Sequence, residues 1–465
     1  MLQNIIKKMI TPTYLLIWLV LSLYMGYNHE PFSDEAQSFL IAKNASISEI
    51  FSVISRTEGT PALWYLWLKL CIFIGISYEY LSVTSIIPMF LGVALWIHKS
   101  PFPKVVTYLF PLSYFIFYQY NIVARNYSLL FLFMMLTSIC YPKRQEKPFL
   151  YVLSLMFTAS ITAYSFIFSC GMFCIYILEQ IKQKQSIIPQ IVLYGIFTLL
   201  TIISLFPEID NRYLADNIRA RQVILHNLAY VSHQGFVAGY LHNEYYILLV
   251  LAGLLYFGYI LYYLFREYPL QSLLLFLPTL SVMIIVPYHP WHSGILILII
   301  MMIIMLHPSR GKINPKYMKI ALILFFINQL CASSYLFIKD SQEAYSGGKQ
   351  LARCIKEKGL DLDAICMPTY NSICVIPYFP KTSQSYWDWR KDGFVRKDVI
   401  RELSKCEAFV ITEELYVSRK ENFDKLQQEQ GYKMDKFFGG TFFPYVNAHQ
   451  QETQYFYYRS ADNEK

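Results

Sequence analysis

Charged residues are scarce in this sequence. They make up 15% of its 465 residues, whereas a soluble domain carries about 25%. The shortage is confined to residues 1–337, where long apolar runs alternate with short charged gaps. Residues 338–465 have the composition of a soluble domain. The sequence therefore predicts two parts, a transmembrane domain over 1–337 and a soluble domain over 338–465.

Other signals are missing as well. The sequence has no internal repeat and no low-complexity tract, which excludes repeat architectures and compositionally biased linkers. No cysteine spacing resembles a zinc site. The first apolar segment lacks a small-residue cleavage site, so we expect an uncleaved membrane anchor. If the soluble region lies outside the cytoplasm, one or two disulfides are expected among Cys354, Cys366, Cys374 and Cys406.

What the sequence does contain is a series of about twelve apolar segments. A spanning helix needs about 20 apolar residues, and several of these segments are short enough to be re-entrant or tilted. We expect an α-helical polytopic membrane protein with about 11–13 spans and a small C-terminal α/β domain outside the cell. The segments are 12–27, 61–77, 79–98, 104–120, 126–141, 149–165, 166–180, 188–206, 244–265, 270–287, 293–307 and 316–337.

The basic residues assign sides to the loops. The net charge is +8, and much of that surplus flanks apolar segments, so we expect membrane lipids and not nucleic acid as the partner. The positive-inside rule places the C-terminal domain outside a cell membrane, together with loops 28–60, 207–243 and 288–292. The basic stretches expected in the cytoplasm are Lys7/Lys8, His98–Lys104, Lys143–Lys147, Lys182/Lys184 and Arg310–Lys319.

One conflict remains over residues 61–98. The charges require a single crossing there, yet the region holds two apolar segments. Either one segment lies along the membrane surface, or a basic loop breaks the rule.

The C-terminal region predicts a small α/β sandwich, because helical and strand-like stretches alternate along it. The expected helices are 346–358, 399–405 and 421–430, and the expected strands are 364–368, 372–376 and 408–412.

The first outer loop, residues 28–60, carries the acidic residues of greatest interest. Ser33 is a good N-cap, and Asp34 and Glu35 would follow in the first turn of a helix. The apolar stripe over 36–41 predicts a helix lying on the membrane surface, and residues 47–54 give a second one.

Asp34 and Glu35 are our candidate catalytic residues. A transferase that attacks a sugar with a hydroxyl needs a carboxylate to accept the proton. A lipid-linked donor keeps its tail in the bilayer, so the reaction belongs at the interface, a few residues beyond the first span. The alternative is that both acids only stabilise a helix N-terminus.

Three other residues have candidate roles beside that site. Glu58 would orient the acceptor or support Asp34, unless it is a solvated loop acid. Arg125 would grip a phosphate in fork geometry, unless it is an interfacial arginine that snorkels. His292 would contact the donor phosphate or sugar, unless it belongs to an interfacial belt of aromatic residues.

In this order, these motifs resemble the GT-C superfamily of integral-membrane glycosyltransferases, near the protein O-mannosyltransferase and aminoarabinose-transferase branch. The resemblance covers most of residues 10–310 as scattered short motifs. They are Asp34–Gln37, Glu58–Trp64, Arg125–Leu129 and His292–Gly294.

The resemblance implies a polyprenyl-phosphate sugar donor, inversion at the anomeric carbon, and a glycan, lipid or protein acceptor. Asp34 would act as base or acceptor orienter, with Glu35 beside it, and Arg125 would bind the donor phosphate. Position 58 departs from the pattern, because bacterial relatives often have His there. Some relatives bind a divalent cation through loop acids and others do not, so the metal ligands are unknown.

Two other functions remain open. A transporter or flippase for lipid-linked glycans carries charges inside its spans, whereas here the acids gather on one outer loop. A polysaccharide polymerase or ligase would use a large outer loop such as 207–243, which leaves the acidic motif after the first span unexplained.

Overall fold

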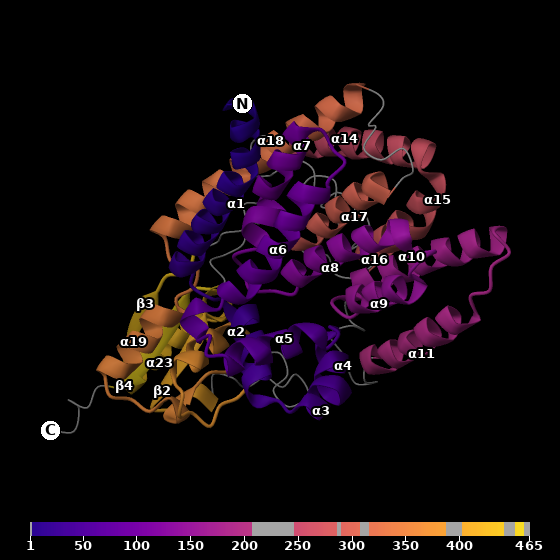
Figure 1. The fold of residues 1–465 in the computed structure, drawn as a ribbon. Helices are drawn as coiled ribbons and strands as arrows, with labels where there is room; N and C mark the ends of the chain where they lie inside the picture. Colours follow the sequence, from indigo (N-terminus) through magenta and orange to yellow (C-terminus); the bar gives the residue numbers. More distant parts are fainter. Residues whose placement is uncertain are drawn as a thin grey trace. The chain divides into compact units, whose positions relative to one another are not determined.

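The computed structural model describes residues 2–206, 246–285, 290–306, 316–386, 402–440 and 452–459. The loop 207–243 and His289 lie outside this described part. The chain is mostly helical, with one small sheet (Figure 1).

The chain divides into two compact units. Unit 1 comprises Met1–Leu23, Ser48–Trp64 and Ser85–Tyr335. Unit 2 comprises Tyr24–Ile47, Tyr65–Thr84 and Leu336–Lys465. The predicted boundary between 337 and 338 stays a prediction. By contacts, the start of the first outer loop groups with the C-terminal region.

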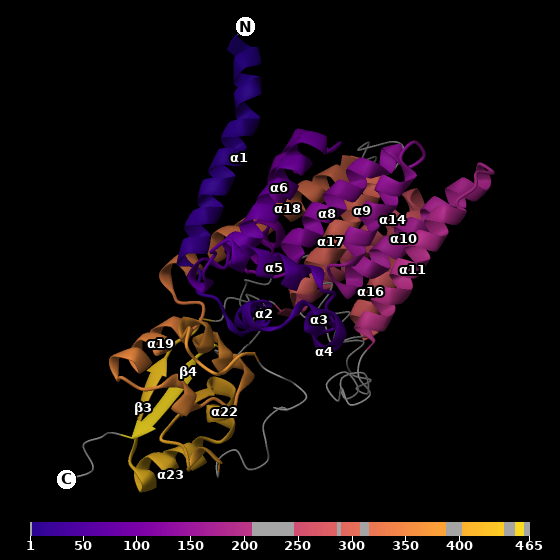
Figure 2. The ribbon, with the colours of Figure 1, turned by 60° about the horizontal axis from the view of Figure 1, so that its bottom comes forward.

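Unit 1 is a helical bundle, seen along its side in Figure 2. Its central element is α17 (Ser293–Leu306), every residue of which is buried. A helix that is apolar on all sides is stable only when other elements surround it, and α17 packs against α8 (Tyr127–Cys140) and the π-helix η7 (Ser272–Phe276). The long helices that lie wholly or mainly in this unit are α1 (Leu2–Asn28), α6 (Val83–Lys99), α9 (Pro148–Ala159), α10 (Ala163–Lys182), α11 (Ile188–Leu205), α14 (Tyr246–Glu267) and α18 (Lys316–Gln342).

Several described helices are long and apolar enough to cross a membrane, which indicates a multi-pass membrane protein. Five such helices occur among the described residues: Met9–Asn28, Tyr78–Lys99, Ala163–Lys182, Ile188–Leu205 and Met318–Gln342. Shorter apolar helices accompany them at Leu63–Phe73, Tyr127–Lys143, Pro148–Ala159, Pro269–Met283 and Ser293–Leu306.

The helix lengths bear on the conflict over residues 61–98. The helix α5 (Leu63–Phe73) has 11 residues, which at 1.5 Å per residue reach about 16 Å, half of a bilayer core of about 30 Å. The stretch Tyr78–Lys99 has 22 residues and is long enough. A single crossing in this region, as the charges require, is therefore compatible with the structure.

The expected segment 104–120 is not one continuous helix. It forms α7 (Lys104–Leu109), the 3-10 helix η3 (Phe110–Leu112) and the π-helix η4 (Tyr114–Gln119). Pro111 lies at the break, where it lacks a backbone N–H and its ring clashes with the preceding turn.

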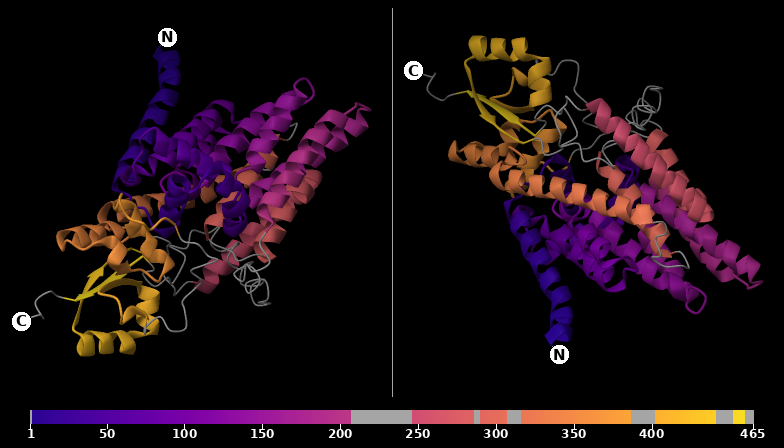
Figure 3. Two further views of the ribbon diagram at one scale, coloured as in Figure 1. Left: turned by 90° about the horizontal axis from the view of Figure 1, so that it is seen from below. Right: turned by 90° about the horizontal axis from the view of Figure 1, so that it is seen from above.

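Unit 2 contains a four-stranded mixed sheet with strand order β1-β2-β4-β3. Strands β1 (Ile365–Cys366) and β2 (Ala408–Thr412) are parallel, and β4 (Gln454–Arg459) runs antiparallel to both β2 and β3 (Tyr432–Phe437). Every residue of the central strand β2 is buried. Figure 3 shows the sheet with the helix α23 (Lys420–Gln430) from two further sides.

The α/β prediction for this region is confirmed in class and in several elements. The helices α19 (Gly348–Glu357) and α23 and the strands β1 and β2 lie where they were expected. The expected strand 372–376 is wrong, because these residues belong to the 3-10 helix η10 (Tyr370–Tyr378), which packs against α19. A short apolar run does not distinguish a strand from a buried helical turn. Strands β3 and β4 were not predicted.

A disulfide joins Cys366 of β1 to Cys406, two residues before β2. It confirms one of the one or two disulfides expected for this region, while Cys354 and Cys374 are free thiols.

The predicted surface helix in the first outer loop is instead a buried one. The helix α2 (Ser33–Asn44) buries Ser33 and all of Glu35–Ala42 within unit 2, in contact with η10. The residues of α2 are buried on nearly all faces of the helix, not only along its apolar stripe. The ammonium of Lys69 donates to the carbonyl oxygens of Ala42 and Ala45 (2.9 and 2.8 Å), a favourable position for a cation at a helix C-terminus.

Candidate functional site

The site begins at the N-terminus of α2. The N-cap residue is Phe32, not Ser33 as predicted. The first free backbone N–H is satisfied from within the helix, because Glu35 Oε2 accepts from the Phe32 N–H at 3.1 Å. Asp34 and Glu35 occupy the first turn, as expected, where the helix dipole favours negative charge.

Glu35 is held by a fully buried histidine. His29 Nε2 lies 3.0 Å from Glu35 Oε2, and His29 Nδ1 lies 3.0 Å from Asp340 Oδ2. All three side chains have no solvent exposure. One imidazolium therefore bridges two carboxylates, one from the first loop and one from the end of α18.

The charge of this cluster depends on the pKa of His29. Burial alone lowers that pKa, but the carboxylates of Glu35 and Asp340 outweigh burial and raise it to about 10. At neutral pH the ring is therefore a cation that donates from both nitrogens. A buried ion triad of this kind is costly to break, since each remaining charge would lose its partner.

Asp34 has a different environment from Glu35. Its side chain is half-buried, and its Oδ1 accepts a hydrogen bond from the Tyr370 hydroxyl at 3.0 Å. Tyr370 is the first residue of η10, so the C-terminal region positions this carboxylate.

A fourth acid, Glu452, lies beside Ser33. The Ser33 hydroxyl donates to its Oε1 at 2.9 Å, while its buried Oε2 has no hydrogen-bond partner among the described residues. Burial is the main cause that raises the pKa of Glu452, the hydrogen bonds from Ser33 lower it, and the charges of Asp34 and Glu35 raise it; the resulting pKa is about 8. At neutral pH this carboxyl is therefore mainly protonated, and it can donate as well as accept.

The acids Asp34, Glu35 and Glu452 consequently differ in the chemistry that they can perform. Glu35 is immobilised in the ion triad, Glu452 is largely neutral, and Asp34 is the half-exposed one, fixed by a single phenol. Of the three, Asp34 is best suited to take a proton from an incoming hydroxyl, because a general base must be both positioned and reachable.

The loop before α2 is anchored to η10 by a buried tyrosine. Tyr78 Oη lies 3.3 Å from the carbonyl oxygens of both Pro31 and Cys374. On the other side of η10, an added Cβ on Gly348 would approach Cys374 Sγ to 2.8 Å. The glycine thus permits the close packing of α19 that holds η10, and with it Tyr370, in place.

The other predicted site residues belong to unit 1. Glu58 is the last residue of α4 (Ser55–Glu58), and the helix stops at Gly59 in the left-handed conformation (φ 60°). Its assignment as an acceptor or supporting residue stays a prediction.

Arg125 and His292 lie on segments of unit 1 that contact each other. Arg125 is half-buried in the turn between η4 and α8. In the same turn, the Tyr120 hydroxyl donates to the Trp291 carbonyl at 2.5 Å. Gly294 allows this approach, since a Cβ there would lie 2.4 Å from the Tyr120 oxygen.

His292 itself faces a tyrosine. Its Nδ1 lies 3.3 Å from the Tyr164 hydroxyl, and the two ring centroids are 5.0 Å apart. The predicted donor-phosphate residues Arg125 and His292 thus lie in one unit, and their roles stay predictions.

Sequence reasoning missed His29, Asp340, Tyr370 and Glu452. His29 had a weak signal, because it lies in the same loop, five residues before Asp34. Asp340 follows the last apolar segment by three residues. Tyr370 and Glu452 had no signal, because they reach the site from more than 300 residues away along the chain.

The described residues offer no group of three or more His, Cys, Asp or Glu side chains arranged to hold a metal ion. Comparison with protein-family models, curated proteins and solved structures gives no match.

Proposed function

We propose that this protein is an integral-membrane glycosyltransferase. It would transfer a glycosyl group from a polyprenyl-phosphate donor to an acceptor at the outer face of the membrane, with inversion at the anomeric carbon. Asp34 would take the proton of the acceptor hydroxyl as that oxygen attacks the anomeric carbon. The polyprenyl phosphate leaves with the electron pair of the broken bond.

The observation that carries the proposal is the arrangement around Asp34. It is a half-buried carboxylate at a helix N-terminus, six residues after the first candidate span ends at Asn28. The Tyr370 hydroxyl orients it, and the His29 triad fixes the turn on which it stands. A general base held in this way gains rate because it needs little reorganisation in the transition state.

The outer location is supported by two independent features. The disulfide Cys366–Cys406 lies in the same unit as Asp34, and disulfides persist mainly in oxidising compartments. The basic loops, by the positive-inside rule, put residues 28–60 on the same outer side.

Donor binding is assigned to unit 1. Arg125 offers a planar fork of donors that matches a phosphate, and His292 is positioned by Tyr164 on a segment that contacts the Arg125 turn. Polyprenyl-phosphate donors present one such anionic group at the interface.

The decisive experiment replaces Asp34 by Asn, which keeps the size and the hydrogen bond from Tyr370 but removes the base. We expect transfer from labelled polyprenyl-phosphate sugars in membranes to fall by about 10²–10⁴-fold, with normal expression and insertion. Asp361→Asn is the matched control, because Asp361 is an exposed cap of a 3-10 helix and Asn caps as well as Asp. Undiminished transfer by the Asp34 variant would defeat the proposed mechanism.

A second experiment addresses the donor site. Arg125→Ala should raise the KM for the polyprenyl-phosphate donor, because the fork of donors to the phosphate is lost, and leave the KM for the acceptor near that of the wild type. Equal effects on both substrates would contradict the assignment of Arg125 to the donor phosphate.

A further inference from the structure

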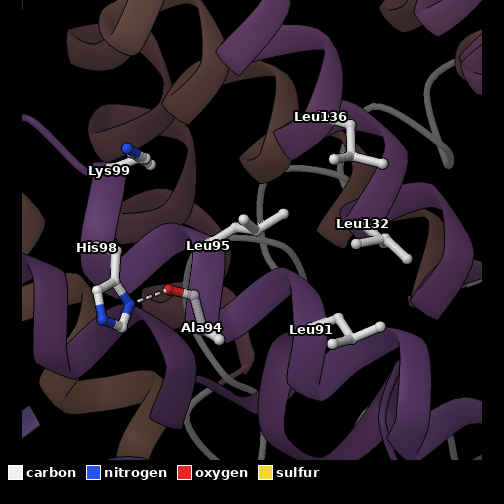
Figure 4. Close-up of a pocket in the computed structure, with 7 residues that line it drawn as sticks. All are labelled: Leu91, Ala94, Leu95, His98, Lys99, Leu132 and Leu136. Carbon is white, nitrogen blue, oxygen red and sulfur yellow. Dashed lines mark hydrogen bonds between the residues drawn. The ribbon is translucent and has the colours of Figure 1, made fainter.

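An open groove lies between α6 and α8 in unit 1, and none of the residues that line it has a role in the proposed reaction. Its volume is about 620 Å³. Leu91 and Leu95 line it from α6, and Leu132 and Leu136 line it from α8 (Figure 4). Leucines four residues apart share one helix face, so each helix contributes a continuous apolar stripe.

The groove ends at two basic residues. Lys99 continues the stripe of Leu91 and Leu95 by one further turn, and His98 stands beside it. The His98 Nδ1–H donates to the Ala94 carbonyl at 2.8 Å, which fixes the ring at the groove end. Both side chains are exposed, and Lys99 makes no ion pair with any described residue.

The surrounding sequence contains no acidic residue that could balance the charge of Lys99. Residues 80–145 contain no Asp or Glu, although Lys99, Lys104 and Lys143 lie among them. A negative group that neutralises Lys99 must therefore come from a distant segment or from outside the chain.

The same combination of features occurs a second time on α8. A smaller groove of about 170 Å³ is lined by Ile139, Cys140 and Leu150, and by Lys143 and Lys147. In both places an apolar channel ends at lysines, on loops that the positive-inside rule assigns to the cytoplasm.

We propose that the groove between α6 and α8 binds an anionic phospholipid of the cytoplasmic leaflet. An acyl chain lies along the four leucines, and the phosphate contacts the Lys99 ammonium. Lipid-facing leucines alone would accept any lipid. An apolar groove beside a lysine that pairs with no acid among the described residues selects a negative headgroup, because an anionic headgroup gains about 1 kcal/mol for each nearby lysine.

The test uses the full-length protein, reconstituted in nanodiscs that contain both phosphatidylglycerol and phosphatidylcholine. The protein is then released from the nanodiscs into mild detergent. Native mass spectrometry then counts the lipids that stay bound. The wild type should retain phosphatidylglycerol preferentially. Lys99→Gln should reduce its retention about fivefold and leave retention of phosphatidylcholine unchanged. Lys104→Gln is the matched control, since Lys104 is an equally exposed lysine that does not line the groove.

A second variant tests the apolar part. Leu136→Trp fills the groove and should reduce phosphatidylglycerol retention to a similar extent. If Leu136→Trp fails to fold, as judged by gel filtration and thermal melting, Ala94→Leu fills the same groove from α6. Equal retention of the two lipids by the wild type would overturn the proposal, as would equal losses in the Lys99 and Lys104 variants. Unchanged retention in a folded, filled variant would also overturn it.

Discussion

The two units bury polar groups in different ways. Among the described residues, the buried Asp, Glu, His, Lys and Arg side chains are His29, Glu35, Asp340 and Glu452, and all of them belong to unit 2. The buried polar side chains of unit 1 are hydroxyls and amides, such as Ser138, Thr158 and Asn121.

The difference lies in where the partners come from. In unit 1 many hydroxyls bond to a carbonyl of their own helix, as Ser138 does to Met134 and Thr158 to Ser154. These hydrogen bonds are made within one helix and need no second helix or strand. A buried charge needs a countercharge, which in unit 2 arrives from a segment 311 residues away. The buried charges of unit 2 therefore depend on contacts between segments that are distant along the chain. The candidate base Asp34 lies in the same helix turn as one of these charges, Glu35.

The largest expected effect on stability comes from removing the buried cation. His29→Gln keeps a polar side chain of similar size but leaves Glu35 and Asp340 without a countercharge. We expect a loss of about 3–5 kcal/mol, seen as a lower melting temperature in detergent. Arg144→Gln is the control in unit 1, because its pair with Glu179 is partly exposed and such pairs contribute about 1 kcal/mol or less. Equal losses would remove the contrast between the units.

The pH dependence sharpens the same contrast. The pKa of His29 is about 10 in the folded protein against an ordinary 6.5, so its stabilising contribution is complete below pH 6.5 and lost as pH rises through 10. The pKa of Glu452 is about 8 against an ordinary 4.5. Its titration therefore changes the free energy of unfolding between these two pH values and adds little further change above pH 8. The difference in melting temperature between wild type and His29→Gln should therefore shrink between pH 8 and 10. A constant difference would contradict a charged His29.

The next effect concerns the disulfide of unit 2. Cys366 and Cys406 are separated by 40 residues, and a loop of that length corresponds to about 4 kcal/mol in the chain-entropy model. A Cys366→Ser/Cys406→Ser double variant should melt at a correspondingly lower temperature. Reductant should lower the melting temperature of the wild type and leave that of the double variant unchanged. A wild type insensitive to reductant would show that the bond does not form.

The smallest effect tests packing in unit 1 with two glycines. A Cβ on Gly171 would lie 2.2 Å from the Leu274 carbonyl oxygen, whereas a Cβ on Gly195 meets nothing within 4 Å. Gly171→Ala should cost about 1–3 kcal/mol through overpacking. Gly195→Ala should be neutral or gain about 0.5–1 kcal/mol of helix stability. If the two variants melt alike, α10 and the segment around Leu274 do not pack closely.

Local patterns in the sequence account for the elements that were predicted correctly. Apolar runs predict the long helices of unit 1, because a bilayer accepts few other structures. The helix expected over 421–430 is α23, and it ends at Gly431, which is left-handed at φ 69°. Strand β4, with the sequence QYFYYR, gave no alternating pattern, since its first four residues are all buried and a strand buried on both faces does not alternate.

For the candidate site, the sequence by itself determined the acidic turn of Asp34 and Glu35, because helix-terminus preferences act within a few residues. Only the tertiary structure decided which acid is locked, which is neutral and which is reachable. Those properties depend on burial and on the charges of His29, Asp340 and Glu452, and electrostatic partners are chosen by distance in space and not by distance along the chain.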